Sequence, residues 1–296
     1  MASTDVPNPY GKGEPIDEET VLAGMSSLSD ELTKEFDQRK DQFSKHNLKQ
    51  RKFTEKLINQ TGIDIREFIE ASSHEELSRR ERLKNLQPLP PQSVKVSPSS
   101  FNGSLHVTRT PPYEYQWTWS ARWGNAGINT LTADKGNGRL VNVTYANDEC
   151  ALSSRAAVGV FFRPISRNGQ LIISASPSLH VLGWADSDFG SGQIDGWIGL
   201  YVRAYNMDRS SAGAVLRQQN YLYSEHVSWL DNFETDFATT GYPISAMIPV
   251  DDSHMYTVWV WTGTFVSSGG KGLLYWCIVN SAHHHDVPSI SLTYFG

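Results

Sequence analysis

Residues 113–123 read Y-E-Y-Q-W-T-W-S-A-R-W, with aromatic residues at nearly every second position. Successive side chains of an extended strand point to opposite faces of a sheet, so the aromatic residues share one face and most polar residues share the other. A strand with one apolar and one polar face is typical of an antiparallel sheet. The stretch therefore predicts an antiparallel β protein. Its core should lie in the same part of the chain, because all nine tryptophans lie at or after Trp117.

Beyond Ser99 the chain consists of short apolar or alternating runs separated by turn sequences. Val258 and Val260 alternate with Trp259 and Trp261, so this run is apolar on both faces and predicts a central strand. We expect it to form a hairpin with the next strand across residues 267–271. About ten strands without intervening helices predict a mainly β fold, an antiparallel sandwich of jelly-roll type, with a closed barrel as second choice. The expected strands span residues 104–109, 113–123, 139–146, 156–163, 170–176, 179–184, 194–206, 214–227, 254–266, 272–280 and 288–294.

The region before the strands has a different pattern. Residues 17–84 contain no proline and only two glycines, and Leu28, Leu32, Phe36 and Phe43 follow the spacing of an apolar helix face. This helix should end near Gly62, and two shorter helices should follow over residues 64–71 and 73–86. Helices this polar need a surface to dock on, which could be the β domain, each other or a second copy of the chain. We favour a helical hairpin or bundle used in self-association.

Four segments follow from these patterns. Residues 1–16 predict an extended arm, and residues 17–86 a small α-helical region. Residues 87–98 contain four prolines and predict a stiff linker. Residues 99–296 predict the β-sandwich.

Bulk properties exclude several classes of function. The net charge of −6 and the lack of a long basic arm argue against nucleic acid as a partner. The sequence contains no run of about 18 apolar residues, so no transmembrane helix is predicted. No secretory signal is visible, which leaves a cytoplasmic location or release by a non-classical route. Cys150 and Cys277 are interpreted as two buried thiols, with one disulfide as the alternative.

Aromatic residues give the first candidates for a binding site. Regular alternation of Tyr115, Trp117 and Trp119 favours a role in the core of the sandwich. Trp184, Trp197 and Trp229 lie beside expected turns. A structural role is favoured for each of them too, but they are better candidates than the alternating residues for an exposed platform that stacks against a glycan.

Metal binding is a second hypothesis. Asp186, Asp188 and Asp195 surround a glycine-rich loop and could supply oxygen ligands to calcium. His283 and His285 share one face of an extended segment, and two imidazoles at this spacing can bind zinc or nickel. No other cofactor is expected.

No catalytic residue is predicted, because the chain lacks a G-x-S-x-G nucleophile elbow, a P-loop and a dinucleotide-binding fingerprint. The leading hypothesis is a non-catalytic binding protein. Its β-sandwich would recognise a surface or a glycan, and its helices would form or anchor a homo-oligomer. The alternatives are a structural subunit of a larger assembly (a virion, phage appendage or bacterial particle), a metal-dependent hydrolase based on the histidines, and a secreted toxin.

Overall fold

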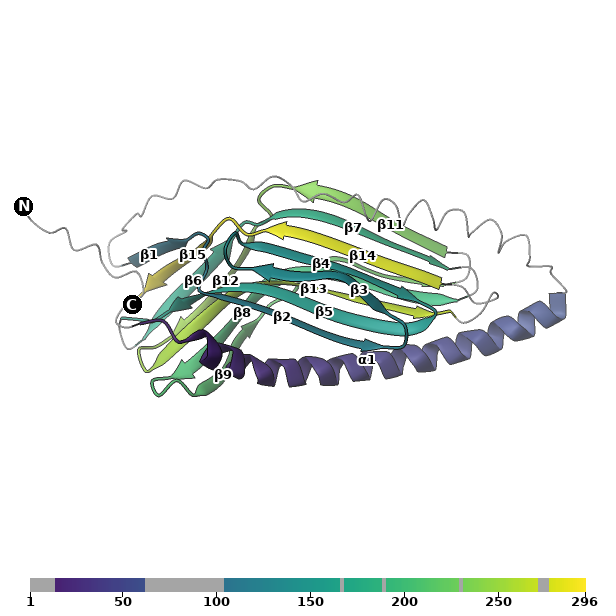
Figure 1. The fold of residues 1–296 in the computed structure, drawn as a ribbon, viewed down its shortest axis with the longest axis horizontal. Helices are drawn as coiled ribbons and strands as arrows, with labels where there is room; N and C mark the ends of the chain where they lie inside the picture. Colours follow the sequence, from purple (N-terminus) through teal and green to yellow (C-terminus); the bar gives the residue numbers. More distant parts are fainter. Residues whose placement is uncertain (1–13, 62–103, 166–167, 188–189, 229–230, 271–276) are drawn as a thin grey trace, which may run out of the picture.

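The structure is a computed structural model that describes residues 14–61, 104–165, 168–187, 190–228, 231–270 and 277–296. Figure 1 shows one long helix, α1 (Glu18–Thr61), beside a stack of strands. The two shorter helices, the proline-rich linker and most of the arm expected from the sequence lie outside the described residues. The strands are β1 (Ser104–Arg109), β2 (Tyr115–Trp123), β3 (Gly127–Asp134), β4 (Arg139–Asn147), β5 (Glu149–Phe162), β6 (Gly169–Ala175), β7 (Ser178–Ser187), β8 (Ser191–Asn206), β9 (Ser211–Arg217), β10 (Asn220–Ser228), β11 (Asp231–Thr239), β12 (Ile244–Val250), β13 (His254–Gly269), β14 (Cys277–Asp286) and β15 (Ile290–Phe295).

The strands form three antiparallel sheets. The six-stranded sheet has the order β10-β8-β13-β5-β2, with β9 also beside β8, and the five-stranded sheet has the order β11-β7-β14-β4-β3. A four-stranded sheet, β1-β15-β6-β12, lies at one end (Figure 1). Eight strands follow jelly-roll connectivity: β4-β14-β7-β11 face β5-β13-β8-β10, and most successive strands alternate between the two layers. The predicted antiparallel, jelly-roll-like sandwich is therefore confirmed.

Some predicted strand details were wrong. β13 and β14 do not form a hairpin, because they belong to the six-stranded and five-stranded sheets respectively. The expected strand over residues 214–227 is two strands, β9 and β10. β3, β11 and β12 were not predicted. All three are edge strands, which bury less surface and so carry a weaker apolar pattern.

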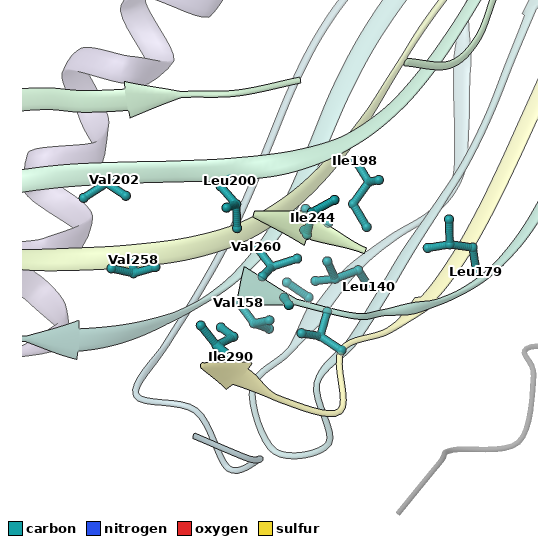
Figure 2. Packing of buried hydrophobic residues seen from close by; sticks show 14 of the residues in the cluster. Leu140, Val158, Leu179, Ile198, Leu200, Val202, Ile244, Val258, Val260 and Ile290 are labelled. Atoms are coloured by element: carbon teal, nitrogen blue, oxygen red, sulfur yellow. The ribbon is translucent and has the colours of Figure 1, made fainter. Parts of the chain in front are cut away.

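The interior between the sheets is mainly aliphatic. Val258 of β13 pairs with Val160 of β5 and Val202 of β8, so one continuous valine row points inward. Figure 2 shows these strands meeting Ile244 of β12 and Ile290 of β15. The four-stranded sheet therefore contributes to the same core. The central position predicted for residues 254–266 is confirmed, since β13 lies between β5 and β8.

Helix α1 covers the outer face of the six-stranded sheet. Asp17 caps its first turn by accepting hydrogen bonds from the Thr20 backbone N–H at 2.8 Å and the Thr20 hydroxyl at 3.0 Å. At 1.5 Å per residue its 44 residues span roughly 66 Å. The predicted apolar stripe is confirmed, because all of its members are buried: Leu28, Leu32, Phe36 and Phe43.

The aromatic side chains of β2 contact this helix. Tyr115 and Trp117 join Trp259 and Trp261 in a buried cluster with the apolar face of α1, and Trp119 packs partly buried against it. They are core residues, as predicted for Tyr115, Trp117 and Trp119. The core they form, however, lies between helix and sheet instead of between the two sheets. Docking on its own β domain is thus how α1 buries its apolar face.

Polar contacts fix the position of α1 along the sheet. Arg217 donates two hydrogen bonds to the Glu35 carboxylate at 2.5 and 2.6 Å. The Asn47 side-chain amide donates to the Gly269 carbonyl at 2.8 Å, about three turns further along the helix. These contacts specify the axial position of α1, which apolar burial alone leaves less well defined.

Candidate functional site

A cavity of about 290 Å³ lies between α1 and the six-stranded sheet. Its rim is exposed and polar, formed by Gln38 and Gln42 of α1 together with Tyr221 of β10, whose side chain is 53% exposed. Its floor is buried and carries Arg155 of β5 and Trp197 of β8. The cavity therefore leads from solvent to a buried guanidinium and an indole ring.

The floor depends on a glycine. Gly263 of β13 pairs with Arg155 on one side and with Trp197 on the other. A Cβ atom at Gly263 would meet both side chains. Its absence lets the Arg155 guanidinium carbon lie 4.0 Å from the centre of the Trp197 ring, in a cation–π contact across the strand. The ring of Trp197 in turn lies 6.0 Å from that of Tyr221, tilted by 56°.

The other charges around the cavity are paired. Arg39 forms an ion pair with Asp195 and lies 3.7 Å from the centre of the Phe265 ring. Asp195 also accepts a hydrogen bond from the Ser224 hydroxyl at 2.8 Å. Glu35 is held by Arg217, as described above.

Arg155 differs from these groups. Its side chain donates to the Ser153 hydroxyl at 3.0 Å and to the Ser154 carbonyl at 3.1 Å, and both of these acceptors are neutral. Among the described residues its Nε atom has no hydrogen-bond partner, nor has the Trp197 indole nitrogen. Burial, followed by the nearby Arg217 and Arg39, lowers the pKa of Arg155. Arginine starts so far above neutrality that we treat the group as a cation at pH 7. Glu35 partly offsets this lowering of the pKa, but among the described residues Arg155 makes no ion pair, so a positive charge without a direct counterion lies at the cavity floor.

The structure places the predicted aromatic residues as follows. Trp184 is only 2% exposed and lies in a buried cluster of the five-stranded sheet, and Trp197 is 1% exposed. Both rings are buried, so neither is an exposed platform: Trp184 packs in a cluster with Leu182 and Ile278, and Trp197 packs with Phe36 of α1 and Phe265. Trp197 nevertheless lines the cavity, so a ligand-binding role for it stays a prediction. Trp229 lies outside the described residues.

The two predicted histidine ligands lie between the sheets. His283 shares hydrogen bonds with the Tyr223 hydroxyl at 2.7 Å and the Thr262 hydroxyl at 3.3 Å. His285 contacts the same Thr262 hydroxyl at 3.2 Å, and the two imidazole centres are 5.2 Å apart. Burial lowers the pKa of His283 to about 3 and that of His285 well below its usual value. Both imidazoles are therefore neutral at pH 7 and bonded to hydroxyl groups.

The predicted calcium ligands are not brought together. Asp186 is on β7 of the five-stranded sheet, whereas Asp195 is on β8 of the six-stranded sheet and is engaged by Arg39. Asp188 lies outside the described residues. Among the residues that the structure describes, no group of three His, Cys, Asp or Glu side chains could hold a metal ion. Metal binding stays a prediction.

Two further expectations can be compared with the structure. Cys150 and Cys277 are both buried and unpaired, as the leading interpretation held. Within the described ranges, no helix has both the length and the apolar character required to cross a bilayer.

Sequence analysis missed the principal residue of the cavity. Residues 150–162 contain a single charged residue, Arg155, in an otherwise uncharged strand. A charge in such a run must either reach the surface or be buried for a reason. That signal was available, although the sequence does not show that Trp197 and α1 would surround the guanidinium.

No protein-family model matches the chain, and no curated protein matches it in sequence. Among solved structures, it is similar to the CBM22-1 xylan-binding domain from Paenibacillus barcinonensis Xyn10C. The identity is 10%, the match covers 57% of this chain and 85% of that one, and the TM-score is 0.17. It is also similar to TmCBM61 in complex with β-1,4-galactotriose, with 10% identity, coverage of 52% and 86%, and a TM-score of 0.14. A third similar structure is a family 11 carbohydrate-binding module from Clostridium thermocellum, with 10% identity, coverage of 60% and 88%, and a TM-score of 0.16. Similarity this low carries no argument about what the chain binds.

Proposed function

We propose that this protein is a non-catalytic glycan-binding protein whose binding site is the cavity between α1 and the six-stranded sheet. One observation carries the proposal. The cavity combines aromatic rings, Trp197 and Tyr221, with polar side chains that converge on the same space, Gln38, Gln42 and Gln219. A sugar presents apolar C–H faces and a ring of hydroxyl groups. Aromatic faces pack against the former, and side-chain amides can donate to and accept from the latter.

The size of the cavity is consistent with this proposal. At about 290 Å³ it lies near the lower end of the range found for small-molecule sites, so one or two sugar rings are the expected occupants. The long aromatic row of β2 and β13 is not the proposed platform, because α1 covers it.

A glycan array followed by calorimetry tests the proposal. Tyr221→Ala removes an exposed ring from the rim and should reduce affinity for any array ligand at least about tenfold, with little change in stability. Met247→Ala is the matched control, since Met247 is 63% exposed on β12 of the four-stranded sheet. Absence of binding to every glycan on the array, or equal binding by the Tyr221→Ala variant, would reject the proposed function.

A second candidate is a structural subunit of a larger assembly that forms through homo-oligomerisation. Jelly rolls serve capsids as well as lectins, and Leu48 of α1 is 54% exposed. Light scattering over a hundredfold range of concentration separates the candidates. A constant monomer mass would reject the subunit function, and a discrete oligomer or particle would support it.

A further inference from the structure

We propose that the cavity selects acidic sugars, with the guanidinium of Arg155 binding the ligand carboxylate. This inference rests on the proposed function and adds the class of glycan. A neutral sugar brings no counterion for the Arg155 guanidinium, whereas an acidic sugar brings a carboxylate that compensates its charge.

The charges around the cavity favour an acidic ligand. Every other charged side chain that lines the cavity has a partner of opposite sign: Arg39 has Asp195, and Glu35 has Arg217. Arg155 is 4% exposed, and its hydrogen-bond acceptors within the described part of the chain are a hydroxyl and a carbonyl. A buried charge without a counterion is costly to the folded protein. A binding role explains why the chain carries one at this position.

The hydrogen-bond donors at the cavity floor also suit a carboxylate. Arginine presents several N–H donors in one plane, which matches the two oxygens of a carboxylate. The Nε atom of Arg155 and the indole nitrogen of Trp197 are two buried donors without acceptors among the described residues, and both side chains line the cavity. A carboxylate supplies acceptors for both, and the sugar ring that carries it would extend toward Tyr221 and the glutamines at the rim.

The test compares sugars that differ in charge and little else. D-Glucuronate with D-glucose, and D-galacturonate with D-galactose, form matched pairs, and the methyl ester of each uronic acid removes the charge while keeping the carbonyl. We expect at least one uronate to bind at least about 10-fold more tightly than its neutral partner and its ester. Its affinity should also fall as salt is raised.

Arg155→Met assigns the effect to the proposed residue. Methionine keeps much of the stem and removes the charge, so the preference for the uronate should disappear. The melting temperature should stay the same or rise, because replacing an unpaired buried charge with an apolar group of similar volume relieves its desolvation. Arg217→Met is the control for the melting temperature. It should lower that temperature, because it leaves the Glu35 carboxylate unpaired.

The outcomes separate the two proposals. If neutral glycans bind and the matched uronates bind no better, acidic selectivity is wrong while glycan binding stands. If the uronate preference survives in Arg155→Met, the assignment to Arg155 is wrong. If no glycan binds at all, the proposed function fails and this inference fails with it.

Discussion

The two faces of the six-stranded sheet differ in chemistry although they belong to the same strands. The inner face carries mainly aliphatic residues such as Val160, Val202 and Val258, which belong to one core cluster with residues of the five-stranded and four-stranded sheets. The outer face carries aromatic residues, arginines and Asp195 beneath α1, together with the cavity. Both faces stabilise the protein, and the outer face combines burial with charge and open space. The difference indicates that the helix–sheet interface is where ligand chemistry should be sought.

Neighbouring residues of β13 compare the faces most directly. Trp259→Ala on the outer face should lower the free energy of unfolding by about 3–5 kcal/mol, because the ring is fully buried between α1 and the sheet. Val258→Ala on the inner face should cost about 2 kcal/mol, since it removes fewer buried atoms. Urea unfolding measures both. An equal loss of unfolding free energy in the two variants would mean that α1 does not cover Trp259.

Docking of α1 on its own sheet can be tested on the helix. Leu28→Ala should cost about 2–4 kcal/mol because Leu28 is buried against the sheet, whereas Leu22→Ala, at a position 39% exposed, should cost less than about 0.5 kcal/mol. The melting temperature of both variants should be independent of protein concentration. A dependence on concentration would show that α1 packs against a second copy.

The histidines are among the buried polar residues on the inner side of the sandwich. The folded-state pKa of His283 is about 3 and lies below the value of 6.5 for an unperturbed histidine. As pH falls, the unfolded chain takes up the proton first, so this contribution is full above about pH 6.5 and declines toward pH 3. The loss at pH 5 should be roughly 2 kcal/mol for His283. Thermal melts at pH 7, 6 and 5 measure it, and His283→Gln should have a flatter pH profile than the native chain.

The smallest effect expected concerns the Arg39–Asp195 pair on the outer face. A double-mutant cycle with Arg39→Gln and Asp195→Asn should give a coupling energy of about 1–2 kcal/mol, reduced because the Arg39 side chain is 30% exposed. The Lys40–Asp37 pair of the same helix, whose carboxylate side chain is 55% exposed where that of Asp195 is 2% exposed, is the control and should show coupling near zero. Chemical unfolding of the single and double variants measures both cycles. Equal coupling in the two pairs would mean that burial adds nothing to the first.

Particular residues show how far sequence patterns reached. Alternation identified β2 and β13, and helical spacing identified the buried stripe from Leu28 to Phe43. Alternation gives the face of a residue but not what lies opposite. For that reason Tyr115 was correctly predicted as core while the partner of that core, α1, was left open. The β13–β14 hairpin was wrong for a similar reason, because adjacency in sequence does not reveal a crossing between sheets.

The sequence by itself determined the antiparallel fold class, the leading helix and the burial of the aromatic ladder, because these follow from local periodicity and apolar content. Only the tertiary structure decided that the helix covers the aromatic face, that Asp195 pairs with Arg39, and that Arg155 faces a cavity beside Trp197. Those contacts join residues more than 40 positions apart. They depend on jelly-roll connectivity and on the axial position of α1, and no local pattern encodes either.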